Sequence, residues 1–126
     1  MNNTEKIRSF TDLKSWKEGH KLVLEIYKIT SDFPESEKFG LSNQLRRASV
    51  SVTSNIAEGF SKESYKEKVL FYRRGLGSLT EIQNQLLVAR DVGFISDKTF
   101  KDFAEQTVIV SKLLNGIIKK SKDFYS

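Results

Sequence analysis

The 126-residue chain contains no cysteine. The sequence therefore excludes a disulfide framework and any metal site built on thiolates, and a reduced, cytoplasmic setting is the simplest expectation. No stretch approaches the roughly 20 consecutive apolar residues that a membrane-spanning helix needs. The first residues, MNNTEK, precede no apolar run of the kind that marks a secretory signal. We accordingly expect a cytoplasmic protein with no membrane partner.

Residues that interrupt helices are also scarce. Pro34 is the only proline, and turn-forming residues gather at 32–40, 60–64 and 91–96. The segments between these breaks have the length of helices. They predict four helices, at about 13–33, 38–60, 65–92 and 97–122, within a single domain covering residues 1–126.

Capping signals support these boundaries. A serine, threonine or aspartate before a helix accepts hydrogen bonds from its first free N–H groups, and a glycine after a helix permits the backbone to reverse. Pro34 favours an end to the first helix just before it. The expected caps and stops are Asp12, or Ser15 paired with Glu18, for the first helix, Ser64 paired with Glu67 for the third, Gly93 after the third, and Ser96 before the fourth.

Helical periodicity indicates which side of the first helix is buried. The residues expected to face the core are Trp16, Gly19, His20, Val23, Ile26, Tyr27 and Thr30. Further apolar residues lie outside this stripe, which suggests a second buried face and favours assembly into an oligomer. They are Leu22, Ile29 and Phe33 on the first helix, Leu70 and Val88 on the third, and Ile109 and Leu113 on the fourth.

The segment QLRRASVSVTSNIAEGF, residues 44–60, alternates like a strand in its middle. A strand there would need a partner, and no second segment with a period of two residues occurs. Apolar residues instead recur at helical spacing from Leu41 to Phe60, with Val52 and Ile56 at the centre. The segment therefore predicts a helix. Its many small residues permit either a close crossing with a helix of the same chain or a subunit interface.

Helices joined by short connections run antiparallel to one another. The fold expected from the sequence is therefore all-α, an up-down-up-down four-helix bundle. Several segments then point to a family: FTDLKSW, FGLSNQLRRASVSVTSNIAEGF, SLTEIQNQL and VGFIS occur in this order. Over about residues 10–118 the chain resembles the bacterial four-helix-bundle family of the 23S ribosomal RNA intervening-sequence proteins.

The resemblance implies a small all-α protein without enzymatic activity, assembled as a ring-like homo-oligomer, by analogy with pentameric relatives. The accessory protein of diversity-generating retroelements is similar in fold, and it serves a reverse transcriptase and its nucleic acid. The family name reflects where some of the genes lie, within inserts in ribosomal RNA genes. Neither likeness implies a catalytic site.

The sequence offers little that fits catalytic or metal chemistry. A di-iron bundle needs two Glu-x-x-His pairs, and the only histidine, His20, has no acid three residues before it. We expect His20 to be a core or interface residue. The segment RRGLGSL lacks the spacing and lysine of a phosphate loop, so close helix contact is the simpler explanation for Gly75 and Gly77. No cofactor, metal or small-molecule substrate is expected.

The basic residues are the remaining candidates for function. The chain has 21 lysines and arginines against 16 acids, and its second half, residues 64–126, carries most of the excess. Arginine forks suit phosphate groups, although each arginine can instead pair with an acid such as Glu58 or Glu81. No aromatic residues are evident among the exposed cations. The predicted nucleic-acid contacts are Arg46, Arg47, Lys66, Arg73, Arg74, Lys119 and Lys120.

The sequence thus favours a basic, non-enzymatic, oligomeric helical adaptor that binds RNA or a protein that handles nucleic acid. The alternative is a protein–protein scaffold with no role in nucleic-acid binding, in which the arginines serve subunit contacts.

Overall fold

The computed structural model describes residues 6–125, and the side chains of residues 6–122. It contains four α-helices, which are α1 (Lys14–Thr30), α2 (Leu41–Ser61), α3 (Tyr65–Asp91) and α4 (Asp97–Tyr125). Two short 3-10 turns, η1 (Phe10–Asp12) and η2 (Glu35–Glu37), precede α1 and α2. The described part of the chain contains no strand, so the all-α prediction is confirmed. No helix in that part is long and apolar enough to cross a membrane.

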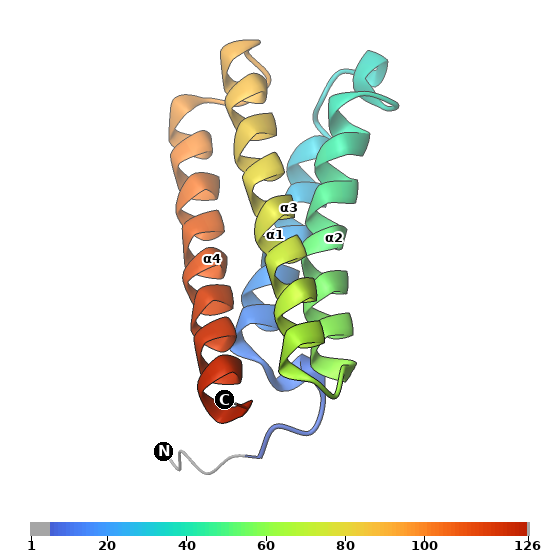
Figure 1. Cartoon of the computed structure of the whole chain (residues 1–126). Helices are drawn as coiled ribbons and strands as arrows, with labels where there is room; N and C mark the ends of the chain where they lie inside the picture. The colour runs from blue at the N-terminus through green and yellow to red at the C-terminus, as the bar shows by residue number, and fades with distance from the viewer. Residues whose placement is uncertain (1–5, 126) are drawn as a thin grey trace.

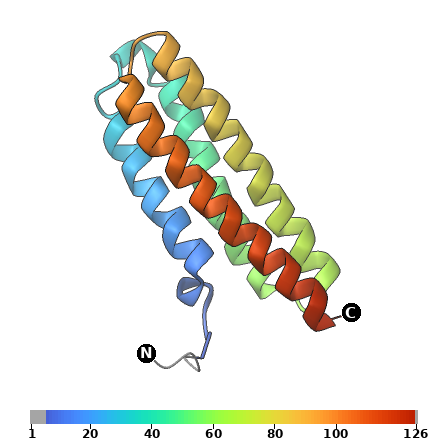
Figure 2. The same cartoon turned by 90° about the vertical axis from the view of Figure 1, so that its left-hand side faces the viewer.

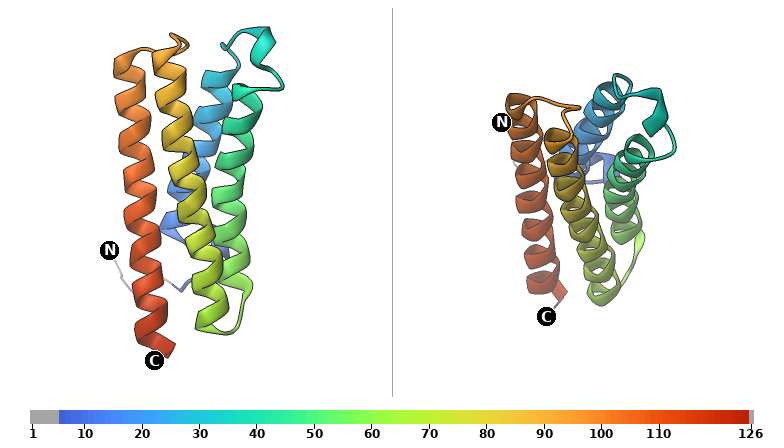
Figure 3. Two further views of the ribbon diagram at one scale, coloured as in Figure 1. Left: turned by 45° about the horizontal axis from the view of Figure 1, so that its top comes forward. Right: turned by 90° about the horizontal axis from the view of Figure 1, so that it is seen from above.

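The four helices run alternately up and down and lie side by side (Figures 1 and 2). Each helix packs against two others, in the cyclic order α1, α2, α3, α4. Over residues 6–125, neither diagonal pair of helices brings Cα atoms within 8 Å of each other. The view from above in Figure 3 shows this arrangement. The predicted antiparallel four-helix bundle is therefore present within one chain.

The core confirms the helical interpretation of residues 44–60. Leu45, Val52 and Ile56 of α2 are 0% exposed. They pack with apolar side chains from all three other helices, among them Ile26 of α1 and Leu114 of α4. In a strand, Val52 and Ile56 would face the side opposite to Leu45. Because all three residues are buried, the segment must have the helical period.

The small residues of α2 bring α2 and α3 close together within the chain. The Ser51 and Ser78 hydroxyl oxygens lie 2.9 Å apart in a hydrogen bond across the seam. A Cβ atom added at Gly59 would lie 2.5 Å from Cε1 of the buried Tyr72 ring. One added at Gly75 would lie 3.6 Å from the Val52 carbonyl oxygen. The close crossing within the chain, one of the two explanations for the small residues, is therefore present.

The first helix is rotated relative to the predicted face, and this corrects the expected core. Leu22 is 0% exposed, whereas His20 is exposed and Tyr27 is 44% exposed. The reason is the close approach of α2 at Gly19, where an added Cβ would lie 3.1 Å from Thr53 Cγ2. The side of α1 that carries small residues thus faces α2, and in this orientation Leu22 is buried.

Two further residues of the supposed spare surface also belong to the core. Phe33 is 8% exposed, and Ile29 is partly buried against the core. Leu113 on α4 is half-buried. By contrast, Leu70, Val88 and Ile109 are exposed, so only part of the predicted second apolar face is available.

The caps differ from prediction at the first helix. Asp12 does not cap α1; its carboxylate accepts the Arg8 and Ser9 backbone N–H groups at 2.9 and 3.1 Å in η1. These hydrogen bonds lower the pKa of Asp12 below its ordinary 3.8, because they favour the charged form. Leu13 is the N-cap residue of α1 and offers no side-chain hydrogen bond. The Ser15–Glu18 box is also absent, since the buried Ser15 hydroxyl has no partner within residues 6–122.

The other predicted caps are present. The Ser64 hydroxyl oxygen accepts the Glu67 N–H at 3.2 Å, and that of Ser96 accepts the Thr99 N–H at 3.1 Å. Gly93 has φ +87°, and the Phe94 N–H donates to the Ala89 carbonyl at 2.8 Å. This is the hydrogen-bond pattern of a Schellman motif, so Gly93 ends α3 as expected.

The helix boundaries differ most around Pro34. The first helix ends at Thr30 instead of continuing to residue 33, because residues 31–33 turn and insert Phe33 into the core. The second helix begins at Leu41 instead of residue 38, because η2 and Gly40, whose backbone is not helical (φ −108°, ψ −117°), occupy the preceding residues.

Two predictions for α3 are wrong. Gly77 is exposed, and a Cβ added there would meet nothing within 4 Å, so close packing does not explain this glycine. The helical spacing of Leu76, Leu79, Leu86 and Leu87 predicts one buried side, yet Leu87 is 39% exposed. Both residues are rotated away from the face that carries Leu79 and Leu86, which are fully buried.

Candidate nucleic-acid interface

The two adjacent arginines of α2 have different surroundings. Arg46 Nε donates to the Thr30 hydroxyl oxygen at 2.8 Å, and its guanidinium carbon lies 4.8 Å from the centre of the Tyr27 ring. Arg46 therefore connects α2 to α1 and is partly committed to the fold. Successive helical residues point about 100° apart, so Arg47 leaves the same helix in another direction. It is exposed and forms no ion pair within the described residues.

Arg47 stands between two open hollows on the surface. The hollow toward α1 has a volume of about 500 Å³ and is bordered by Tyr27, Arg46 and Val50. The hollow toward α3 has a volume of about 510 Å³ and is bordered by Phe39, Glu81 and Gln85. Arg47, Asn43 and Ser51 line both. This guanidinium is thus accessible from both sides of α2.

The basic residues of α3 also point in more than one direction. Lys66, Arg73 and Arg74 are all exposed. The Arg74 guanidinium lies 5.0 Å from the centre of the Phe71 ring, and Lys62 Nζ of the α2 end also lies 5.0 Å from it. Aromatic rings therefore do lie beside surface cations, which corrects the expectation that the two are not interleaved. The sequence does not reveal this pattern, because the ring and the cation come from different turns or different helices.

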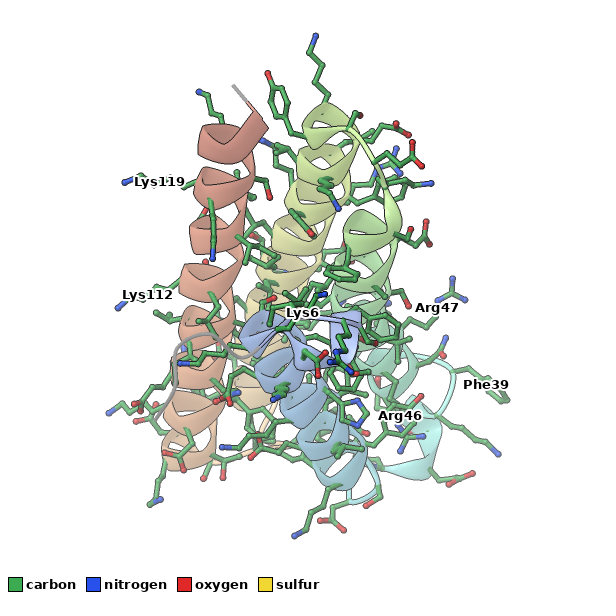
Figure 4. All side chains as sticks on the ribbon, turned by 90° about the horizontal axis from the view of Figure 1, so that it is seen from below. Lys6, Phe39, Arg46, Arg47, Lys112 and Lys119 are labelled. Carbon is green, nitrogen blue, oxygen red and sulfur yellow. The ribbon has the colours of Figure 1, made fainter. Side chains whose placement is uncertain are left out.

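The lysines of α4 lie apart from the arginines of α2. Lys119 and Lys120 are exposed. In the view of Figure 4, Lys112 and Lys119 project from one edge of the bundle, while Arg47 and Phe39 project from the opposite edge. The seven predicted contacts consequently do not form a single patch on one chain.

Pairing with acids, the alternative explanation for the arginines, is found elsewhere. Arg90 Nε lies 2.9 Å from an Asp91 carboxylate oxygen, and its Nη1 lies 3.8 Å from one of Asp97. Within the described residues, neither Glu58 nor Glu81 forms an ion pair with any of the predicted arginines. Arg46, Arg47, Arg73 and Arg74 thus keep charge available for a partner.

The family model of the 23S rRNA-intervening sequence proteins matches residues 11–116. The chain belongs to this family. No curated protein matches this family member.

A solved structure has the same fold as this 23S rRNA-intervening sequence family member. It is a protein of unknown function from the S23 ribosomal protein family of Bacteroides thetaiotaomicron VPI-5482. The two chains superpose with a TM-score of 0.77 at 20% identity, over 83% of this chain and 95% of the other. At this identity the likeness supports the bundle architecture.

Some cations of this family member serve the fold. Lys68 Nζ donates to the Phe60 carbonyl at 2.7 Å, at the end of α2. Partial burial lowers the pKa of Lys68, because removal from water disfavours the charged ammonium. Lys68 was not among the predicted contacts, and its partners agree with a structural role.

The remaining titratable groups offer no metal site in the described part of the chain, where no three His, Asp or Glu residues cluster. His20 is exposed rather than buried, and its ring stacks on Trp16 with centroids 4.6 Å apart. Periodicity alone missed Phe39, which is 87% exposed beside Lys38. Its position immediately before Gly40, in a segment rich in helix breakers, was the available signal that it lies in a loop.

Proposed function

We propose that this protein is a non-enzymatic, basic, homo-oligomeric adaptor that binds RNA, with Arg47 at the centre of the contact surface. The family is described by its link to 23S rRNA intervening sequences, and this description motivates RNA as the partner. Phosphate contacts from arginine bind any sequence and weaken steeply with salt. The protein would thus recognise RNA mainly through its backbone.

One observation carries this proposal most directly. Arg47 is exposed, has no acidic partner within the described residues and lies between two hollows large enough to admit a nucleotide. Arg46 is beside it but is held by Thr30 and Tyr27. We therefore assign Arg47 the main phosphate contact and Arg46 a supporting one.

Assembly would bring the separated cations into one field. Leu24, Leu70 and Val88 are 57%, 49% and 43% exposed, which leaves apolar surface for subunit contacts. In a pentameric ring of copies, which the family resemblance implies, Lys119 and Lys120 of one subunit and Arg47 of another contribute to the same positive surface. A common ancestry with the retroelement accessory protein would account for such a design. Native mass spectrometry measures the stoichiometry, and a monomer at all concentrations would contradict the proposed assembly.

The RNA-binding part is tested by titrating a structured RNA against the full chain over a series of salt concentrations. We expect affinity to fall steeply as salt rises, and Arg47→Glu to weaken binding strongly at low salt. Lys28→Glu is the matched control, because Lys28 is exposed on α1 and changes the net charge by the same amount. Equal losses for both variants, or binding that does not respond to salt, would contradict a contact centred on Arg47.

The same exposed apolar residues favour a second candidate, a protein–protein scaffold. Joint reversal of Arg73 and Arg74 to glutamate separates the two functions. Loss of assembly with this double variant supports the scaffold, since the arginines then serve subunit contacts. Loss of RNA binding with the assembly intact supports the adaptor.

A further inference from the structure

The hollow between α2 and α3 has the chemistry of a binding site for one nucleobase. Its lining includes the small residues Ala48, Ser51 and Ser78, and the two serine hydroxyls are hydrogen-bonded to each other at 2.9 Å. The volume of about 510 Å³ lies within the range typical of small-ligand sites. The small residues at the seam therefore do more than bring the helices together, because they also leave a space that longer side chains surround.

The carboxylate and amide side chains around this hollow are not paired with one another. The Glu81 carboxylate and the Gln44 amide form no hydrogen bond or ion pair within the described residues. Gln85 Oε1 is shielded from solvent, yet no group in that part of the protein donates to it. A carboxylate can only accept hydrogen bonds, whereas an amide both donates and accepts. The Glu81 carboxylate thus offers two hydrogen-bond acceptors beside amides that can donate or accept.

An aromatic ring and a guanidinium complete the surroundings. Phe39 borders the same hollow and is 87% exposed, the highest exposure of any large apolar side chain described. Figure 4 shows Phe39 and Arg47 projecting at the same edge of the bundle. An exposed ring beside a cation suits the stacking of a base and the binding of its phosphate.

We infer that this hollow binds a guanine base of single-stranded RNA, an inference that rests on the proposed function because it shares Arg47 with the RNA surface. The Glu81 carboxylate accepts the N1–H and N2–H donors of guanine. The Gln44 amide donates to O6, Phe39 stacks on the base, and Arg47 contacts the phosphate. Recognition of unstacked bases by their Watson–Crick edges is typical of RNA-binding proteins.

The carboxylate is what selects guanine over the other bases. Only guanine presents two adjacent N–H donors on its Watson–Crick edge. Adenine and cytosine place a ring nitrogen acceptor where N1–H would be, and this acceptor would face the negative charge of Glu81. Uracil offers a single N–H between two carbonyl oxygens. Glu81 would therefore attract guanine and repel its competitors.

The test uses the full chain and three fluorescent single-stranded RNAs, UUGUU, UUAUU and UUIUU, where I is inosine, which lacks the 2-amino group. Fluorescence anisotropy should show UUGUU binding about tenfold or more tightly than UUAUU, as one bidentate contact to a base provides. Inosine should lose most of this preference. Glu81→Gln should abolish this preference. Glu105→Gln is the matched control, an exposed glutamate on α4 outside this hollow.

The outcomes separate this inference from the proposed function. RNA binding without a guanine preference, or a preference that survives Glu81→Gln, overturns the guanine site and leaves the Arg47 surface standing. Binding of free guanosine monophosphate without any binding of RNA supports the hollow as a nucleotide site but overturns the RNA adaptor. If Phe39→Ala dissociates an oligomer and leaves the guanine preference unchanged, a second copy of the chain occupies this edge and the base-stacking assignment is wrong.

Discussion

The close contact of α2 with α3 predicts opposite effects for the same substitution at two glycines. At Gly59 an added Cβ would lie 2.5 and 2.7 Å from two carbons of the Tyr72 ring and 3.2 Å from the Lys68 carbonyl oxygen. Tyr72 is 3% exposed, so its ring has little room to move. Overpacking of this kind destabilises by about 1–3 kcal/mol. The helical preference of alanine returns about 0.5–1 kcal/mol, so Gly59→Ala should destabilise by about 1–2 kcal/mol.

At Gly77 the same change meets nothing within 4 Å. Only the gain in helical preference remains, and Gly77→Ala should stabilise by about 0.5–1 kcal/mol. Urea unfolding followed by circular dichroism measures both, with the fluorescence of Trp16, the only tryptophan, as a second probe. Protein concentration must be matched, because assembly shifts the unfolding midpoint. If Gly59→Ala were as stable as Gly77→Ala, the described contact between Gly59 and Tyr72 would be wrong.

Three further outcomes are expected from the same structure. Gly93→Ala should destabilise by about 1 kcal/mol in thermal unfolding, because alanine disfavours φ +87°; no loss would contradict the turn. Asp12→Asn should reduce the free energy of unfolding at neutral pH. The difference between variant and parent should shrink as pH falls below 3.8, because the parent loses the same charge as the lowered pKa of Asp12 is reached. A difference independent of pH would exclude the carboxylate as its cause. Arg46→Ala should destabilise by about 1–2 kcal/mol through loss of the Thr30 and Tyr27 contacts, whereas Arg47→Ala should change the free energy of unfolding by less than about 0.5 kcal/mol; equal effects would contradict their different roles.

The fold could be predicted because helical period and breaks are local properties of the sequence. Val52 and Ile56 required only the spacing of neighbouring apolar residues, and Gly93 required only its own backbone freedom. The orientation of α1 could not be obtained this way. It depends on the approach of Thr53 to Gly19, a contact between residues far apart in the chain.

In the candidate site, too, some features could be predicted from the sequence and others could not. Arg47 could be selected from its type and its place on the polar side of a helix. The hollow beside it depends on which turn of α3 lies opposite which turn of α2, and no periodicity within one helix contains that register. From the sequence alone Glu81 is only a possible partner for arginine, whereas in the structure it lines the same hollow as Phe39 and Gln85.

The alternating direction of the helices has a consequence for the electrostatics of the molecule. Every helix end with exposed N–H groups lies beside neighbouring ends with exposed carbonyls, so the peptide dipoles of adjacent helices oppose one another. Neither end of the bundle is strongly polarised by its backbone. The field that a polyanion meets is set mainly by ionised side chains, so that charge reversal at single residues can map it directly.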